Sequence, residues 1–184
     1  MKGNLKKILS AILVTAMSVG MCVSASAAPV IGNVDNQSIP LSAAPGSQGY
    51  INVYGNNVID NNRNVCTWTY DGTTAQKWQV KVVDGGRVIK SVLNTRYALN
   101  PDRRSGQNWN CTVYKYYGNE TDALVEVVGY LGNEASGYSI HLVNYPGMYL
   151  KSDGYTNNSN IHWVYNTQSL FGGQETKYVW NLRA

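Results

Sequence analysis

The sequence predicts an all-β domain made of three copies of one unit, the arrangement of a β-trefoil. The 184 residues include 14 Tyr and 5 Trp but only 1 Phe, and just 14% are charged, a composition typical of β proteins with few helices. A short pattern of alternating apolar residues and Gly/Asn turns recurs around Trp68, Tyr114 and Val164, at intervals of 46 and 50 residues. Each unit is too small to bury its own apolar face, so we expect three units to share one core.

The first 27 residues have the pattern of a secretion signal. A short apolar run, Ile8–Val23, follows three lysines and ends at the small-x-small motif Ala25-Ser26-Ala27. Cleavage there leaves a mature, secreted chain that begins at Ala28. An uncleaved membrane anchor is the alternative, which the shortness of the run disfavours.

The mature chain carries almost no net charge. The full sequence has 15 Lys and Arg against 11 Asp and Glu, and removing the three signal lysines leaves 12 against 11, or +1. Binding to nucleic acid or to anionic lipid needs many more cations, and the basic pair Arg103-Arg104 is interpreted as a solvated loop. We therefore expect no nucleic-acid partner and no membrane insertion after signal cleavage. The single predicted domain is also expected to be a monomer.

Residues 28–48 are interpreted as a linker or a loosely docked arm. Three prolines and scattered Ser, Gly and Ala interrupt this stretch, and no periodicity is sustained in it. The predicted domain therefore covers 49–184. Within it, Cys66 and Cys111 either form a disulfide, as an exported chain allows, or are two buried thiols.

The three units predict which residues meet in the core. The first unit runs from "INVYGNNVIDNN" through "RNVCTWTYDGTTAQKW", the second begins at "YALNPDRRSG", and the third begins at "MYLKSDGY". Aligning them makes Trp78, Leu124 and Trp180 equivalent core positions. Gln76 precedes Trp78 by two residues, and a buried amide there must hydrogen-bond to turn backbone.

The stretch "NVCTWTYDGTTAQKWQV" resembles a repeat of the ricin-B-type lectins, carbohydrate-binding β-trefoils that carry a Gln-x-Trp signature. The resemblance covers about residues 49–183 and is strongest in the first repeat. It is weakest in the third repeat, where Tyr178 stands in the place of Gln. It implies a lectin-like module that binds a glycan or glycoconjugate.

The resemblance also implies candidate sugar contacts, although several family positions differ. The family's Asp after the first apolar strand is replaced by Asn52, Asn100 and Lys151, and the Asn before Gln is replaced by Ala75 and Thr121. The remaining candidates for carbohydrate binding are Asn52, Trp68 and Tyr70 in the first repeat and Asn100, Tyr114 and Tyr116 in the second. The alternative is that each Asn caps a turn and each Tyr packs on the barrel flank.

The sequence offers little for catalysis. His141 and His162 have no metal-ligand spacing, and neither a phosphate loop nor a nucleophile elbow is present. We therefore expect no enzyme activity, no metal and no cofactor. Because the family's Asp and Asn are replaced, the alternative function is a trefoil that binds another protein, as a protease inhibitor or as a receptor- or toxin-associated subunit.

Overall fold

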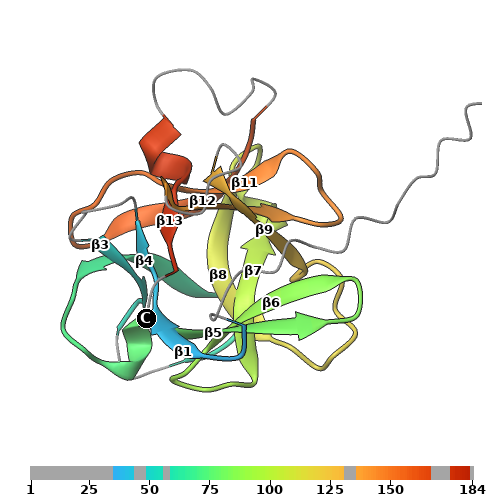
Figure 1. The fold of residues 1–184 in the computed structure, drawn as a ribbon, viewed down its shortest axis with the longest axis horizontal. Coiled ribbons are helices and arrows are strands. Elements are labelled where there is room, and N and C mark those ends of the chain that lie inside the picture. The colour runs from blue at the N-terminus through green and yellow to red at the C-terminus, as the bar shows by residue number, and fades with distance from the viewer. Residues whose placement is uncertain (1–34, 44–48, 56–58, 131–135, 167–174, 183–184) are drawn as a thin grey trace, which may run out of the picture.

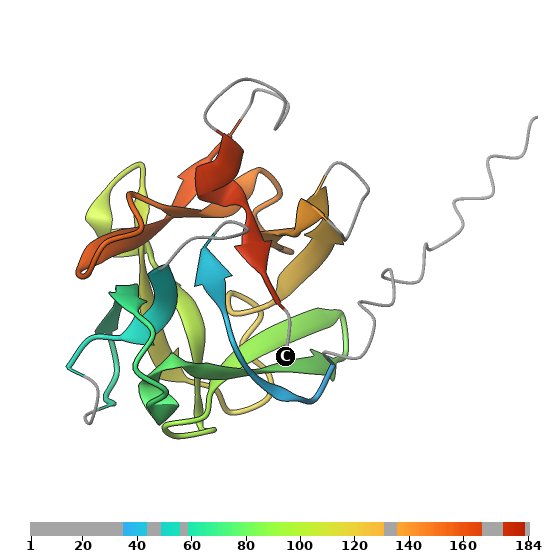
Figure 2. The ribbon, with the colours of Figure 1, turned by 60° about the vertical axis from the view of Figure 1, so that its left-hand side comes forward.

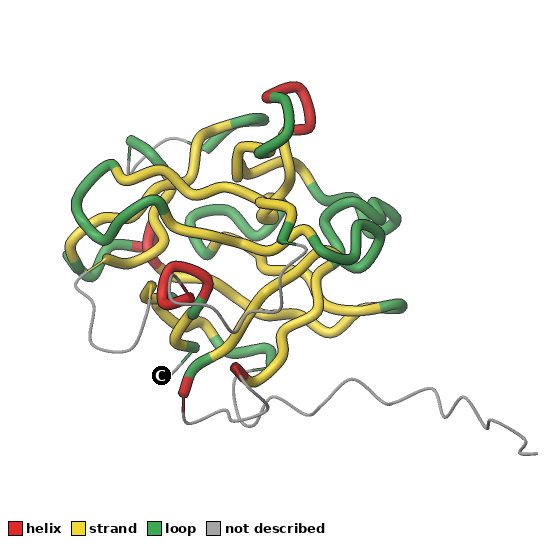
Figure 3. The backbone as a smooth tube through the Cα atoms, turned by 90° about the horizontal axis from the view of Figure 1, so that it is seen from above, coloured by secondary structure: helices red, strands yellow, loops and turns green. Residues whose placement is uncertain are grey.

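The computed structural model describes residues 35–43, 49–55, 59–130, 136–166 and 175–182 (Figure 1). The predicted signal peptide and its cleavage site lie outside these residues. Strands and loops make up nearly all of the described chain, with helix only in short 3-10 segments (Figure 3). No helix in these segments is long and apolar enough to cross a membrane.

The strands fall into three successive groups. The first group contains β1 (Ser38–Pro40), β2 (Ser42–Ala43), β3 (Gly49–Val53), β4 (Arg63–Thr69), η2 (Thr74–Gln76) and β5 (Lys77–Val83). The second contains β6 (Gly86–Ser91), β7 (Tyr97–Asp102), η3 (Arg103–Ser105), β8 (Trp109–Lys115) and β9 (Val125–Gly129). The third contains β10 (Tyr138–Leu142), β11 (Met148–Ser152), β12 (Ser159–Tyr165), η6 (Glu175–Tyr178) and β13 (Trp180–Asn181).

The strands at the beginning and end of each group close into one barrel. Antiparallel pairing runs from β1 to β5, β6, β9, β10 and β13, and β13 pairs back to β2. The two middle strands of each group form the hairpins β3–β4, β7–β8 and β11–β12. The second strands of these hairpins, β4, β8 and β12, pair with one another in a ring (Figures 1 and 2). This arrangement is a β-trefoil, so the predicted fold class is confirmed.

The core keeps the pseudo-threefold relation but places one predicted residue differently. The indole Nε1 of Trp78 donates to the carbonyl of Ile51 at 3.0 Å, and that of Trp180 donates to the carbonyl of Leu150 at 3.0 Å. In the second repeat the matching inward position is Val125, which faces Leu142 as Trp78 faces Ser91. The alignment through Leu124 is wrong by one residue, because the turn before β9 differs in length.

Leu124 packs instead in a small separate cluster with Val88 and Ala123. Gln76 fulfils its predicted role, since its amide accepts from the N–H of Asp71 and donates to the carbonyl of Thr69, both at 2.9 Å. A fully buried polar side chain is thereby satisfied by the turn that it supports.

Residues 38–43 are part of the barrel rather than of a linker or arm. Ile39 pairs with Trp78, Ala43 pairs with Trp180, and Leu41 between them is fully buried. The alternation of Ile39, Leu41 and Ala43 is that of a strand with one face in the core, but Pro40 and the shortness of the run obscure it. The first repeat therefore begins at β1.

Cys66 and Cys111 are both buried free thiols. Cys111 lies in the main core, whereas Cys66 follows the core residue Val65 and so points to the other face of β4. Of the two alternatives for the cysteines, the structure therefore has the pair of buried thiols. Desolvation by burial raises the pKa of Cys66 to about 11 and also raises the pKa of Cys111.

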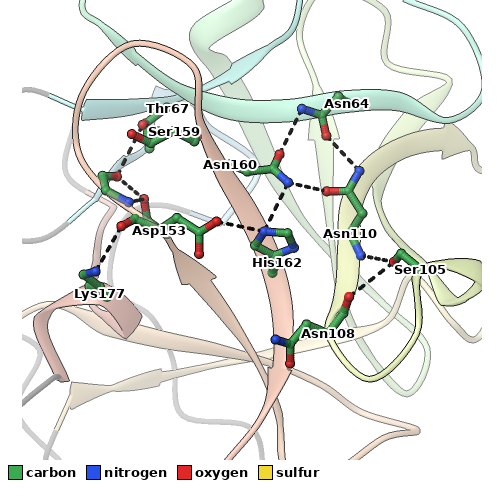
Figure 4. Close-up of polar contacts among 12 residues, drawn as sticks. Asn64, Thr67, Ser105, Asn108, Asn110, Asp153, Ser159, Asn160, His162 and Lys177 are labelled. Atoms are coloured by element: carbon green, nitrogen blue, oxygen red, sulfur yellow. Dashed lines mark hydrogen bonds and ion pairs between the residues drawn. The ribbon is translucent and has the colours of Figure 1, made fainter.

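Three asparagines join the hairpins at the pseudo-threefold axis. Asn64 Nδ2 donates to Asn160 Oδ1 at 3.0 Å, Asn160 Nδ2 to Asn110 Oδ1 at 3.0 Å, and Asn110 Nδ2 to Asn64 Oδ1 at 2.8 Å (Figure 4). We call these three residues the asparagine ring. They occupy equivalent places near the starts of β4, β8 and β12, so the ring ties together the three strands that close this end of the molecule.

Candidate functional site

A cavity of about 340 Å³ lies beside the β3–β4 hairpin, and we call it the aromatic cavity. Its lining comprises Tyr54, Gly55, Trp68 and Asn158. Tyr54 and Gly55 directly follow β3, Trp68 lies on β4, and Asn158 comes from the turn between β11 and β12. The first and third repeats therefore build the cavity together.

The third-repeat turn is fixed against β4 by several hydrogen bonds. Thr67 Oγ1 donates to the carbonyl of Thr156 at 2.7 Å, and the Thr69 N–H donates to Asn157 Oδ1 at 2.6 Å. The Asn158 N–H donates to the carbonyl of Thr67 at 2.9 Å, and Asn158 has a left-handed backbone with φ of 63°. These contacts hold the turn and the Asn158 backbone at the cavity without help from a ligand.

The same turn is pressed closely onto β3. A Cβ atom at Gly49 would lie 2.7 Å from the Tyr155 carbonyl oxygen, closer than real contacts allow. Glycine at the start of β3 is therefore needed for the turn to reach the cavity.

Two partly exposed aromatic rings and one side-chain amide line the aromatic cavity. Tyr54 is 49% exposed and Trp68 is partly exposed, so both present π surface to solvent. The Asn158 side chain can both donate and accept hydrogen bonds. No charged side chain lines the cavity in the described part of the chain. Such a lining suits a neutral ligand with an apolar face and hydroxyl groups.

Only one of the three candidates in the first repeat lies at this cavity. Trp68 lines it, whereas Asn52 is 1% exposed, faces Cys66 across the β3–β4 pair, and donates from Nδ2 to the Val53 carbonyl at 2.9 Å. Tyr70 is exposed and packs against Tyr50, with ring centroids 4.8 Å apart. The structure therefore does not bring Asn52 or Tyr70 to the cavity that Trp68 lines.

The candidates of the second repeat do not meet in one place. Asn100 is half-buried, and its Nδ2 donates to the Pro101 carbonyl at 3.1 Å, the geometry of Asn52 again. Tyr114 is 37% exposed on β8. Tyr116 lines a second cavity to which neither Asn100 nor Tyr114 contributes.

An ion pair spans the second-repeat loop that corresponds to the turn after β3. Asp102 takes the place of Tyr54, and its carboxylate accepts from Arg104 Nε at 2.8 Å and Nη2 at 3.0 Å. Hydrogen bonding to the Arg104 side chain lowers the pKa of Asp102. The carboxylate is thus ionised and already engaged by its own loop.

In the third repeat, Asp153 takes the same place and is engaged by a histidine. Asp153 Oδ2 lies 2.9 Å from His162 Nε2, which also lies 3.1 Å from Asn160 Nδ2 (Figure 4). Lys177 Nζ donates to the Asp153 carbonyl at 3.0 Å, and Lys151 Nζ lies 5.8 Å from the Tyr178 ring centre. Asp153 is therefore held within a polar network rather than left as a free acceptor.

The sequence alone does not mark Tyr54, Gly55 or Asn158 as site residues. Gly55, with φ of 86°, belongs to a Gly/Asn turn that the sequence shows, but a turn alone indicates no ligand. Asn158 lies 90 positions from Trp68, and only the trefoil closure brings the two together.

Solved structures with the same fold are similar to this chain over most of its length. A designed threefold-symmetric protein, ThreeFoil, has a TM-score of 0.60 at 18% identity, over 78% of this chain and 96% of that one. A Macrolepiota procera ricin B-like lectin, solved with lactose, has a TM-score of 0.61 at 12% identity, over 80% and 94%. These likenesses and the three repeats show a β-trefoil fold.

An exo-β-1,3-galactanase from Clostridium thermocellum, 1,3Gal43A, has a TM-score of 0.62 at 18% identity over 80% of this chain. The match spans only 30% of that enzyme. No protein-family model matches the sequence, and no curated protein matches it significantly.

Proposed function

We propose that the protein is a secreted, monomeric module that binds a neutral carbohydrate at the aromatic cavity and has no catalytic activity of its own. The observation that carries this proposal is the pairing of Trp68 and Tyr54 with the Asn158 amide on one cavity. The C–H face of a sugar ring stacks on an aromatic surface while its hydroxyls exchange hydrogen bonds with an amide.

The volume of the aromatic cavity and its preformed third-repeat wall support this function. Its volume of about 340 Å³ lies near the lower end of the roughly 300–1,000 Å³ typical of small-molecule sites. A cavity of this size suits one or two sugar rings. Because hydrogen bonds to Thr67 and Thr69 already fix its third-repeat wall, binding needs little ordering of the protein.

The fold neighbours support the same ligand class. The Macrolepiota procera protein is named a lectin and was solved with lactose, and sugar-binding trefoils are a precedent for function on this fold rather than evidence for this chain. The galactanase match covers less than a third of that enzyme. Its likeness therefore gives this chain no catalytic role.

A glycan array with the mature chain tests the proposal, and Trp68→Ala tests the location. Loss of the stacking surface should weaken binding of any neutral glycan by about 1 to 3 kcal/mol, which takes a millimolar site beyond detection. Asn158→Gly keeps the left-handed backbone and removes the amide, and should weaken binding by about 1 kcal/mol.

The matched control is Tyr165→Ala. Tyr165 is 61% exposed at the far end of β12 and does not line the aromatic cavity, so its removal should leave glycan binding unchanged. Equal loss of binding in Trp68→Ala and Tyr165→Ala would contradict the location. A multivalent array with no glycan signal at all would contradict the function and favour a protein partner, for which the exposed tyrosines are suited.

Mass spectrometry of exported protein should give an N-terminus at Ala28.

A further inference from the structure

A second cavity, of about 260 Å³, lies at the end of the β7–β8 hairpin that is opposite its turn. Arg96, Lys115, Tyr116 and Tyr117 line it, and we call it the basic cavity. It shares no residue with the aromatic cavity. We propose that the basic cavity binds the anionic group of an acidic saccharide, a carboxylate or a sulfate, which goes beyond the function proposed above.

Backbone pairing places the two cationic residues of the basic cavity, Arg96 and Lys115, next to each other. Tyr97 faces Lys115 in the β7–β8 register, and the Tyr116 N–H donates to the Arg96 carbonyl at 2.7 Å. The Lys115 N–H also donates to Asn61 Oδ1 at 3.1 Å. The end of β8 is therefore anchored on both sides, and the backbone positions of Arg96 and Lys115 relative to each other are set before any ligand arrives.

A third cation lies next to this cavity. Lys90 on β6 pairs with Ala98 of β7, and its Nζ lies 5.0 Å from the centre of the Tyr116 ring. Among the described residues, no carboxylate lies within salt-bridge distance of Lys90, Arg96 or Lys115. Three positive charges thus gather where the protein supplies no ion-pair partner, in a chain whose mature net charge is only about +1.

The carboxylate of Glu120, on the loop that carries Tyr117, is turned to the backbone. Its Oε2 accepts from the N–H groups of Tyr117 at 2.7 Å and Gly118 at 3.0 Å. Glu120 therefore shapes the loop that carries Tyr117 and offsets one of the three positive charges. The cavity keeps a local excess of two, which favours an anionic ligand.

The two tyrosines add features that a simple anion site does not need. Tyr117 is 75% exposed, and Tyr116 is partly buried against the small cluster of Val88, Ala123 and Leu124. The Tyr116 hydroxyl can donate at neutral pH, as any tyrosine hydroxyl can, and burial, with Glu120 as the smaller cause, raises its pKa further. Aromatic surface beside paired cations suits a ring that bears an acidic group, as in a uronate or a sulfated sugar.

Binding to three soluble polymers tests the proposal by affinity electrophoresis or calorimetry. Polygalacturonate presents carboxylates, its fully methyl-esterified form presents none, and dextran sulfate presents sulfates. We expect binding to at least one acidic polymer, weakening as salt rises, and none to the methyl ester. The acidic polymer that binds more tightly identifies the preferred anionic group.

Arg96→Gln and Lys115→Gln should each weaken that binding about tenfold, the effect of losing one charge-assisted hydrogen bond. Arg96→Lys should keep most of it. The matched control is Arg104→Gln, which makes the same charge change at an exposed residue beyond the opposite end of β7, on the order of 20 Å away. It should alter affinity by less than twofold. Arg96 lies in a turn, Lys115 ends β8 and Arg104 lies in the short segment η3, and equal melting temperatures show that the variants fold.

Three results would overturn the proposal. They are equal binding of the methyl ester, equal loss in Arg104→Gln and Arg96→Gln, and tighter binding of single-stranded poly(U) than of either acidic polymer, which would indicate a nucleic-acid surface. Trp68→Ala separates the two sites, because it should abolish neutral-glycan binding and leave acidic-polymer binding intact. Failure at one cavity is thereby distinguished from failure at the other.

Discussion

Each amide of the asparagine ring takes part in two of its three hydrogen bonds, so removal of one residue should cost more than one bond. Asn110→Ala removes the bond donated to Asn64 at 2.8 Å and the bond accepted from Asn160 at 3.0 Å. At a net value of about 0.5 to 1.5 kcal/mol for each bond, the free energy of unfolding should fall by about 1 to 3 kcal/mol.

The ring also makes a prediction about additivity. The three single Ala variants together break six ring bonds on paper, whereas the triple variant breaks only the three that exist. The contact of Asn160 Nδ2 with His162 Nε2 at 3.1 Å is lost once in either count and cancels. The hydrogen bonds should therefore contribute about 1.5 to 4.5 kcal/mol to the triple variant, against about 3 to 9 from the sum of the singles. Urea unfolding followed by tryptophan fluorescence measures all four variants.

Asn119→Ala, at an exposed loop position, is the control and should change stability by less than about 0.5 kcal/mol. Single costs that add up fully in the triple variant would refute the cyclic arrangement. They would mean that each asparagine is held by partners outside the ring.

Three further outcomes are expected. Trp78→Ala should lower stability by about 3 to 5 kcal/mol through a core cavity, while Tyr117→Ala, at a 75% exposed residue, should change it by under about 1, both by thermal unfolding. Asn52→Asp should destabilise the fold more at pH 7 than at pH 4. Burial raises the folded-state pKa of the new carboxyl, so stability is lost as pH rises and the carboxyl ionises. An equal loss at both pH values would contradict this. With the pKa of Cys66 raised to about 11 and that of Cys111 also raised, the native mature chain should react slowly with a thiol reagent at pH 8 and yield two thiols after unfolding without reductant, whereas none would indicate a disulfide.

The fold could be predicted because three similar units leave few ways to close a core. The spacing of Trp68, Tyr114 and Val164 that reveals the units also relates Asn64, Asn110 and Asn160. The asparagine ring could therefore have been found from the same alignment. It was overlooked because Asn in a Gly/Asn-rich sequence is usually a turn residue, and nothing local marks these three as strand residues near an axis.

The candidate site could be predicted only in part. Trp68 stands out as an aromatic on a predicted strand, but its neighbours Tyr54 and Asn158 depend on how two hairpins dock. Asn52 was selected by the resemblance alone, whereas strand register turns its side chain toward Cys66 and away from solvent. Which face of a short strand is buried could not be read from a stretch as brief as "INV".

The pairing of β2 with β13 has a consequence for biogenesis. Position 43 meets position 180, so the barrel has two open edges until β13 has been synthesised. Contacts this distant in sequence raise the contact order and slow folding, as expected for all-β topologies. A polypeptide truncated before β13 would expose the unpaired backbone of β2 and β10, which are templates for association with other chains. Strand β13 thus decides whether β2, near the start of the domain, is protected from aggregation.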